Sequence, residues 1–443
     1  MMGIGVALLV ALTFIPSLLM LLGDRIFWPG NIRWGKGKKE SRYSKYFKKS
    51  ARLSLRYAKP ITVLALLISI PATYAVFTLE TSFDFLAAMP ETEASRGLEV
   101  MGEGFGEGRL SPTYIVAEFP EPVRTMEGGN FTYDISLLGS IENLSREIDQ
   151  IYNVHQVIGP TRPLGESIAY TELNNASYRE SFEADIERAI GEDNRTILLT
   201  VVLERESFSA ESVDTIPILR STVKERAQED PNLSEATILV GGASASIRDI
   251  KVILDRDFLV MAIVVILADY ILLMFVLGSV LVPLRLILTV LLSVSWTIAM
   301  TIVVFHLWLQ IPILWLMPWV LFVIAMGLGM DYDIFLTTRI REEVAKGKSD
   351  KKAIVTAVER TGGIITAAGL VMSGAFATML LSSLGLLQEF GFALAFAILL
   401  DAMIVRIYLV PSVMILLEKW NWWAPGRLQR IRREEKKRCR RNS

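Results

Sequence analysis

The chain has 443 residues, of which 52% are hydrophobic, and its formal net charge is only -1. This length exceeds one domain of ordinary size, and the mean hydropathy of +0.41 is typical of a polytopic membrane protein. One cysteine excludes an intrachain disulfide, the two histidines give no zinc-site spacing, and no G-x-x-x-x-G-K-[ST] phosphate loop occurs. We expect no metal, no other cofactor and no nucleic-acid partner.

The N-terminal region predicts two membrane spans with a basic stretch between them. Residues 1–23 form one apolar run, and neither a preceding basic stretch nor a following small-residue cleavage site marks it as a signal peptide. Residues 24–59 hold twelve Lys/Arg and two Asp/Glu, so the positive-inside rule predicts a cytoplasmic linker. Residues 60–79 are apolar again and are long enough for a second span.

A long polar region follows, residues 80–256, with 15 Lys/Arg against 32 Asp/Glu. This acidic balance predicts an external, extracytoplasmic domain. Apolar β-branched runs alternate with helical patterns in the order β-α-β, β-α-β, which predicts an α+β domain of the split βαβ, ferredoxin-like type. Residues 102–108 (GEGFGEG) are expected to form a flexible loop. The strands are expected at 113–119, 154–158, 196–203 and 237–240, and the helices near 136–150 and 209–229.

The C-terminal part predicts a bundle of five spans, residues 257–417, and a basic tail, residues 418–443. The loop 337–362 holds seven Lys/Arg and four Asp/Glu, and the tail holds ten and three, so both are expected in the cytoplasm. With seven spans in all, the basic segments fall on one side of the membrane. We therefore expect a polytopic α-helical protein of the plasma membrane, surrounded by membrane lipids. The five spans are expected near 257–277, 283–305, 313–336, 363–383 and 391–417.

Two aspartates inside the fifth predicted span are the first candidates for a functional site. Asp331 and Asp333 lie in a segment that is apolar from Ile311 to Leu336, where a charged side chain costs about 2.5–3.5 kcal/mol. By the helical period they point about 200° apart, so one is expected to face the bundle. Desolvation favours the neutral form of Asp331, which suits a group that binds and releases protons, and Tyr332 can hydrogen-bond either form. The alternative is that the span ends early and both carboxylates are hydrated.

Small residues in the same spans predict close helix packing. Gly327 and Gly329 each lie four residues before one of the two aspartates, on the same helix face. Gly369 begins a stripe of small residues at four-residue spacing in the next span. Such residues let neighbouring membrane helices approach closely.

Further charged residues occur in the third and last predicted spans. Asp401 and Arg406 are five residues apart, which places them about 140° apart on an α-helix, so they are not expected to pair only with each other. Because intramembrane charges tend to pair, we expect Arg406 to meet an acid on another span, with Asp331 as the first candidate. Asp269 has two open interpretations, a functional role or a local partner for a nearby Tyr or Ser.

One internal repeat links the first predicted span to the last. Residues 14–30 (FIPSLLMLLGDRIFWPG) and 409–426 (LVPSVMILLEKWNWWAPG) share Pro-Ser, an apolar turn, Leu-Leu, aromatic residues and Pro-Gly in the same order. We interpret this as a repeated unit of about 395 residues, with the chain starting at the end of a preceding copy. The alternative is that two span ends share a common aromatic-anchored exit.

Five motifs occur in order along the chain: the segment 82–108, SVLVPLR at 279–285, GLGMDYDIFLTTRIREE at 327–343, RTGGIITAAG at 360–369, and DAMIVR at 401–406 with Pro411. Together they resemble the MMPL branch of the resistance-nodulation-division (RND) transporters. The resemblance implies a proton-coupled secondary transporter that exports lipids or other hydrophobic molecules, with residues 80–256 as its porter domain. It assigns the family's intramembrane Asp-Tyr pair to Asp331 and Tyr332, so the proton relay is expected at these two residues and the adjacent Asp333.

The resemblance also implies twelve spans in two pseudo-equivalent halves, each with one such Asp-Tyr pair. Only one copy occurs here, so we expect either a missing N-terminal half or a homo-oligomer. The alternative is a non-transporting module of the same fold, either a SecD/SecF-like export accessory or a sterol-sensing-like lipid receptor. An enzyme is not expected, because the external region offers no nucleophile–base constellation.

Overall fold

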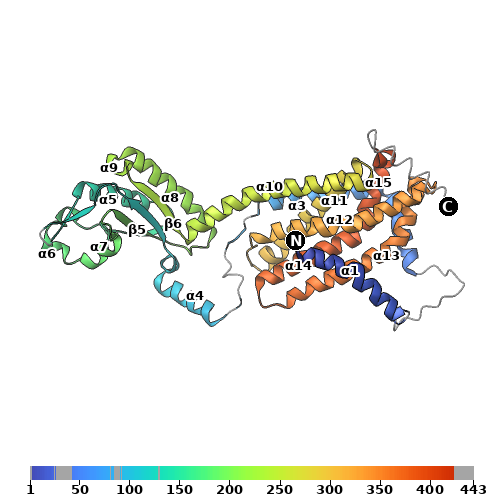
Figure 1. Ribbon diagram of the computed structural model, residues 1–443, viewed down its shortest axis with the longest axis horizontal. Coiled ribbons are helices and arrows are strands. Elements are labelled where there is room, and N and C mark those ends of the chain that lie inside the picture. Colours follow the sequence, from blue (N-terminus) through green and yellow to red (C-terminus); the bar gives the residue numbers. More distant parts are fainter. Residues whose placement is uncertain are drawn as a thin grey trace. The chain divides into compact units, whose positions relative to one another are not determined.

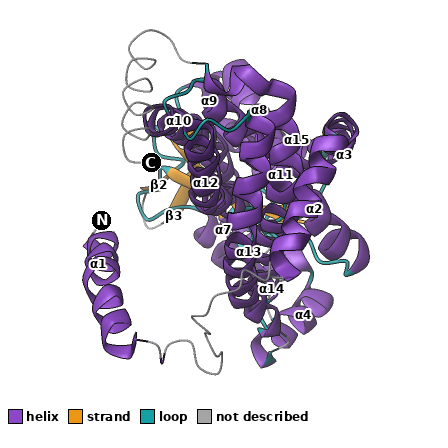
Figure 2. Ribbon diagram, turned by 90° about the vertical axis from the view of Figure 1, so that its right-hand side faces the viewer, coloured by secondary structure: helices purple, strands orange, loops and turns teal. Residues whose placement is uncertain are grey.

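The computed structural model describes residues 2–23, 25, 42–79, 81–83, 90, 92–127 and 130–423, and it divides into two compact units, Met1–Lys45 and Tyr46–Ser443. The predicted linker 24–59 and tail 418–443 therefore lie partly outside the described residues. Helix dominates the chain (Figure 2), and the strands of the described part are confined to residues 113–242.

The porter domain contains a four-stranded sheet in the order β4-β5-β1-β6. Strand β1 is antiparallel to both β5 and β6, and β4 is antiparallel to β5. Parallel strands β1 and β4 are therefore separated by β5 and joined through α5, while β5 and β6 are joined through α8. This is the predicted split βαβ arrangement, and the fold class is confirmed. The elements are β1 (Thr113–Glu118), α5 (Ile135–Asp149), β4 (Val154–Ile158), β5 (Thr196–Leu203), α8 (Ala210–Glu229) and β6 (Thr237–Gly242).

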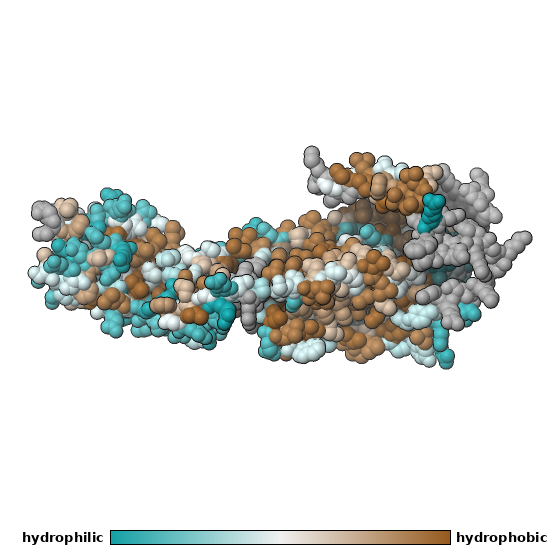
Figure 3. Space-filling view, turned by 90° about the horizontal axis from the view of Figure 1, so that it is seen from below, coloured by the Kyte–Doolittle hydropathy of each residue, from teal (hydrophilic) through white to brown (hydrophobic). Residues whose placement is uncertain are grey.

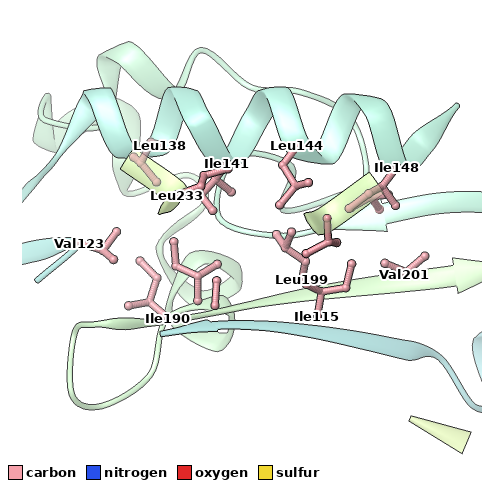
Figure 4. Packing of buried hydrophobic residues seen from close by; sticks show 14 of the residues in the cluster. Ile115, Val123, Leu138, Ile141, Leu144, Ile148, Ile190, Leu199, Val201 and Leu233 are labelled. Atoms are coloured by element: carbon pink, nitrogen blue, oxygen red, sulfur yellow. The ribbon is translucent and has the colours of Figure 1, made fainter. Parts of the chain in front are cut away.

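The core of this domain lies between α5 and the sheet (Figure 4). Alternating residues of β1 and β5 point to one face, and α5 presents an apolar stripe at helical spacing. Burial on one face fixes the strand register, because a slip of one residue would turn all the apolar side chains of that strand to the solvent face. The facing residues include Leu138, Ile141, Leu144 and Ile148 of α5 and Ile115, Leu199 and Val201 of the sheet.

The expectation of a flexible loop at 102–108 was wrong. Helix α4 (Glu93–Phe105) is capped by Thr92 and includes the first half of the glycine-rich motif. Gly106 follows with φ of 92°, and the 3-10 helix η2 (Glu107–Leu110) completes the turn. A Cβ on Gly108 would overlap the backbone carbonyl of Leu203, so this glycine allows a close approach to β5.

Several short elements of the porter domain gave no recognised signal in the sequence. A hairpin of β2 and β3 follows β1, and short helices lie before β5 and before β6. The elements are β2 (Arg124–Glu127), β3 (Asn130–Tyr133), η3 (Tyr170–Glu172), α6 (Ala176–Arg179), α7 (Glu183–Ala189) and α9 (Pro231–Ser234).

Six helical segments are long and apolar enough to cross a membrane, by length and composition. Their exposed surface is largely apolar (Figure 3), and the chain is a multi-pass membrane protein. The segments are α3 (Ala58–Phe77); α10 (Ala243–Leu277); α11 (Leu281–Thr301) with the π-helix η4 (Ile302–Trp308); α12 (Leu316–Ala345); α13 (Asp350–Ala377) with η5 (Thr378–Leu381); and α14 (Gly385–Leu400) with the π-helix η6 (Asp401–Leu409) and α15 (Val410–Leu417), followed by η7 (Glu418–Trp422).

The first predicted span forms an α-helix, α1 (Met2–Leu22), in a unit of its own. Within it, Leu8–Leu22 is apolar but shorter than a full span. A count of seven spans therefore stays a prediction.

Helix α10 connects the porter domain directly to the bundle. It begins immediately after β6 and continues without interruption for 35 residues (Figure 1). At 1.5 Å per residue such a helix is about 52 Å long, well beyond the hydrocarbon thickness of a bilayer. The helix starts 14 residues before the predicted span 257–277, because polar helical turns precede the apolar segment.

The basic stretch before α3 is also helical. Helix α2 (Arg42–Arg56) packs on α13 through the buried side chain of Phe47. The Phe47 ring lies against Gly362 of α13, and a Cβ on Gly362 would lie 2.6 Å from the ring. Lys48 Nζ lies 3.3 Å from Glu359 Oε1. From Tyr46 onward, this amphipathic helix therefore lies against the bundle.

Candidate functional site

Charged side chains meet in the interior of the membrane bundle. Asp333 of α12 is 0% exposed, and Arg406 of the π-helix η6 is 1% exposed. A buried charge is tolerated only when it is paired and hydrogen-bonded. The contacts of these two residues therefore define the site.

Arg406 pairs first with Asp401 of its own helix. Its Nε donates to Asp401 Oδ2 at 2.8 Å, and its Nη2 donates to the same oxygen. The predicted separation of about 140° assumed α-helical geometry and was wrong. Residues 401–409 form a π-helix with i→i+5 hydrogen bonds, which brings residue i+5, here Arg406, closer to the face of residue i, here Asp401.

Arg406 also reaches across to α12, as expected for an arginine that faces the bundle. Its Nη2 donates to the carbonyl of Gly329 at 2.5 Å, and its guanidinium lies 4.9 Å from the centre of the Tyr332 ring. Its Nη1 lies 4.0 Å from Asp333 Oδ1. Among the described residues, neither oxygen of Asp333 has a hydrogen-bond partner.

The acid that meets Arg406 across helices is Asp333, and the choice of Asp331 as first candidate was wrong. Asp331 is exposed on the opposite face of α12, as the separation of about 200° implied. Tyr332 lies between them and touches the cluster, with its hydroxyl 2.8 Å from the Sδ of Met372. The acid of the expected Asp-Tyr pair thus points away from the buried charges of its own bundle.

A small cavity adjoins the charged cluster. It has a volume of about 30 Å³ and is lined by Ser293, Gly329, Tyr332, Asp401 and apolar side chains of α11, α12 and α14. This volume holds one water molecule, and the lining offers polar partners. Asp401 lines the cavity, and its Oδ1 atom has no protein hydrogen-bond partner in the described structure. A water molecule held in this cavity would have the Asp401 carboxyl group as a hydrogen-bond partner.

The predicted packing glycines differ in their surroundings. A Cβ on Gly329 would lie 3.1 Å from Val290, and one on Gly369 would lie 2.6 Å from the Cβ of Ala402, so both positions are tightly packed. Gly327 has no neighbour within 4 Å and lies on the exposed face of α12.

Asp269 is not brought to the cluster. It is half-buried on α10, and the described structure gives it no hydrogen bond or ion pair. The expected local partner is also not observed, since the neighbouring Tyr270 hydroxyl donates to the carbonyl of Val280.

Two buried charged residues were missed in the sequence. Arg285 of α11 is 4% exposed, and Glu389 of α14 is 1% exposed and accepts from the Leu314 amide at 3.3 Å. The signal for Arg285 was present, because this residue lies inside the predicted span 283–305 and ends a quoted motif. Glu389 lies two residues before the predicted span 391–417, and a polar residue outside a span gives no signal of a buried charge.

Comparison with known proteins agrees with this architecture. Residues 90–441 match the MMPL family. A membrane protein of Streptomyces coelicolor is 29% identical over 431 residues, which cover 95% of this chain and 45% of that protein. The apo-petrobactin exporter of Bacillus anthracis is 26% identical over 444 residues (96% of this chain, 53% of the exporter).

A shorter match covers the acyltrehalose exporter MmpL10 of Mycobacterium tuberculosis, with 31% identity over 256 residues (58% of this chain, 25% of the exporter). The chain spans about half, or less, of the length of the curated relatives it matches. The family match covers most of the chain, and the motifs quoted above lie within it or at its border. The chain belongs to the MMPL family.

Proposed function

We propose that this chain is part of a proton-coupled exporter of lipids or other hydrophobic molecules, and that it supplies one half of a two-fold pseudo-symmetric transporter. The observation that carries the proposal is the buried cluster of Asp333, Asp401 and Arg406. A bundle that served only as an anchor would gain nothing from such a cluster, because apolar residues of similar volume are often as stabilising or more so.

The cluster contains two carboxyl groups that compete for one guanidinium group. Arg406 bonds to Asp401 and lies 4.0 Å from Asp333. A proton on Asp401 would neutralise its charge and free Arg406 to bond with Asp333. Because Asp333 belongs to α12 and Asp401 to η6, this exchange changes the attraction between two packed elements. Proton binding is thereby converted into a shift between helices.

The π-helix provides a structural element that can respond to this exchange. π-Helical segments are rare and occur frequently at functional sites. A return of residues 401–409 to α-helical hydrogen bonding would rotate Asp401 and Arg406 apart. The continuous helix α10 offers a rigid connection between the bundle and the porter domain.

The substrate class is taken from the relatives. Among them are an acyltrehalose exporter, a sulfolipid-1 exporter and an apo-petrobactin exporter. Two of these names denote lipids and the third a different small molecule. We therefore propose a hydrophobic or lipidic substrate, exported with protons as the coupling ion.

The exposed face of α12 supports a two-half assembly. Val323, Gly327, Asp331 and Phe335 follow one another at four-residue spacing and are all exposed. A carboxylate facing lipid costs about 2.5–3.5 kcal/mol, whereas a second bundle of the same family would cover it and pack against Gly327. We propose that this α12 face contacts that second half, either another copy of this chain or a homologous half.

The charge asymmetry supports an orientation for the assembly. The porter domain is strongly acidic, and the segments at the other end of the spans are basic. We propose that residues 80–256 face the extracytoplasmic side of the plasma membrane.

The proposal is tested by reconstituting the chain in liposomes, together with its second half if one is required. The probe is phosphatidylethanolamine labelled with nitrobenzoxadiazole, and a membrane-impermeant quencher reports its leaflet. We expect label to cross between leaflets only while a pH gradient is imposed. Movement that is equal with and without the gradient would overturn proton coupling. Binding without movement would favour the non-transporting lipid receptor.

A further inference from the structure

Arg285 is a buried cation with incomplete hydrogen bonding. It lies near the start of α11, where Nη1 is 3.4 Å from the Val410 carbonyl and Nη2 is 3.5 Å from Thr337 Oγ1. Its Nε has no partner in the described structure. A guanidinium carries five N–H donors, so two long hydrogen bonds leave it under-satisfied. The cation is therefore available for a stronger acceptor.

Asp333 is the matching acceptor. Both of its oxygens lack hydrogen bonds, and the arginine within 4.0 Å of it, Arg406, is already bonded to Asp401. Thr337 lies one helical turn beyond Asp333 on the same face of α12, so the hydrogen bond to Thr337 places Arg285 beside that face.

The charged groups around Asp333 come from three elements. Arg285 comes from α11 and contacts Thr337, one turn beyond Asp333; Arg406 comes from η6 with Asp401 bonded to it; and Tyr332 is the neighbour of Asp333 on α12. Taken from η6 through α12 to α11, the charges alternate in sign, in the order Asp401, Arg406, Asp333, Arg285. With all four ionised the cluster is neutral, so Arg285 supplies the charge that the three-residue site lacks.

We propose that Arg285 is the second cationic partner of Asp333, a positioning residue that keeps this carboxylate ionised while Arg406 is held by Asp401. When a proton neutralises Asp401, Arg406 turns to Asp333; when the proton leaves, Arg406 returns to Asp401, and the positive charge of Arg285 beside α12 again compensates Asp333. The exchange rests on the proposed function, since it gives the proton relay its resting state. It makes the start of α11 part of the relay in addition to α12 and η6.

The test uses the purified full-length chain in lipid nanodiscs, with protons as the only ligand. Infrared spectroscopy follows the carboxylic-acid C=O band as pH is lowered, and the contribution of Asp333 is identified by subtracting the spectrum of Asp333→Asn. The variants are Arg285→Gln, which removes the charge, and Arg285→Lys, which keeps it. The matched control is Arg339→Gln, a charge at the same end of α12 that bonds to Glu342.

In Arg285→Gln the Asp333 band is expected to form at a pH higher by about one unit or more, because an adjacent cation favours the ionised acid by this amount. Arg285→Lys keeps the positive charge, so its Asp333 band should form close to the pH of the unaltered chain. Arg339→Gln should leave the band in place. An unmoved band in a folded Arg285→Gln protein would overturn the proposal.

A second variant gives a shift of opposite sign and does not remove a buried charge. Thr337→Val deletes the acceptor that draws Nη2 of Arg285 away from Asp333. Arg285 is then free to bond with Asp333, and the band should form at lower pH than in the unaltered chain. A shift to higher pH, or no shift, would contradict the assignment.

These outcomes separate this inference from the proposed function. If the band shifts as expected but no pH-driven lipid movement occurs, Arg285 partners Asp333 in a bundle that does not transport. If transport is pH-driven and the band does not move, the relay exists without Arg285.

Discussion

Arg406 is the residue on which the polar contacts of the bundle converge. It bonds to a carboxylate of its own helix and to a carbonyl of α12, and it covers the face of Tyr332. Each contact removes part of the large cost of burying a guanidinium. The residue is thus held from two helices, and a loss of either side leaves an unpaired charge.

Replacing Asp401 alone should destabilise the protein more than replacing the pair. Asp401→Leu leaves Arg406 buried without its hydrogen-bonded partner, and broken buried pairs cost about 3–5 kcal/mol. Because Arg406 also lies 4.0 Å from Asp333, single and double variants are compared in a chain with Asp333→Asn, where no second acid is left unpaired. In that chain the double variant Asp401→Leu, Arg406→Met removes both charges, keeps similar volumes and should recover most of this loss. The measurement is thermal unfolding in detergent, followed by tryptophan fluorescence. A double variant as unstable as the single one would show that the pair is not the cause.

The sequence was sufficient to predict that Arg406 faces the bundle and meets an acid on another span. It was not sufficient to choose between Asp331 and Asp333. These residues lie on opposite faces of α12, and the sequence does not show which of the two faces is buried. Burial depends on the packing of α11, α13 and η6 around α12, which no local pattern of α12 encodes. Arg285 was overlooked although its position inside a predicted span gave a signal.

At the scale of single elements, the π-helix is the feature that sequence reasoning missed. The pattern at 401–409 is apolar with two charges and has no proline or glycine. Nothing in such a run separates i→i+5 from i→i+4 hydrogen bonding, because the same apolar residues fit either helix. The four strands of the main sheet were predicted to within two residues, because their apolar β-branched runs are visible within each strand, whereas the short hairpin of β2 and β3 was not.

The contact between α13 and η6 depends on the absence of a side chain at Gly369. A Cβ there would lie 2.6 Å from the Cβ of Ala402, next to Asp401. Gly369→Ala should therefore destabilise the bundle by about 1–3 kcal/mol, as overpacking does. Gly374 on the same helix has no neighbour within 4 Å, and Gly374→Ala should be neutral or slightly stabilising. Thermal unfolding of the two variants compares them directly.

The steric cause has its own check. Adding Ala402→Gly to Gly369→Ala removes the opposing methyl group and should restore stability. Equal destabilisation by Gly369→Ala and Gly374→Ala would point to helix propensity or backbone effects and against a tight contact.

At the scale of the whole molecule, α12 presents an acid-bearing face that is exposed among the described residues. The four-residue stripe through Gly327 and Asp331 is exposed on α12, whereas Asp333 on the opposite face is fully buried. An ionised group on the outside of a membrane bundle is rare unless it meets a partner or water. The prediction of a second half therefore rests on this face as well as on the family resemblance.

Cross-linking tests the assembly. In a chain with Cys439→Ser, Gly327→Cys places a thiol on the proposed contact face, where a Cβ meets no neighbour. If two copies meet across a two-fold axis, mild oxidation in native membranes should give a covalent dimer. Val371→Cys, which is 74% exposed on α13, is the control and should stay monomeric.

Other outcomes of the cross-linking experiment are informative in different ways. A cross-link from Gly327→Cys to a different membrane protein would identify a separate second half. A monomer that retains pH-driven transport, with no cross-link from this face, would contradict the two-half assembly.

The most direct test of the account is pH-driven lipid movement in variants of the buried acids. Asp333→Asn and Asp401→Asn keep the shape of the side chains but cannot carry a proton at the cluster, whereas Asp269→Asn changes an acid outside it. The measurement is quencher-reported movement of labelled phosphatidylethanolamine in proteoliposomes, with membrane insertion checked for each variant. We predict that Asp333→Asn and Asp401→Asn abolish the gradient-dependent part, and that Asp269→Asn retains it. Full gradient-driven movement in a correctly inserted Asp333→Asn, Asp401→Asn double variant would contradict the account.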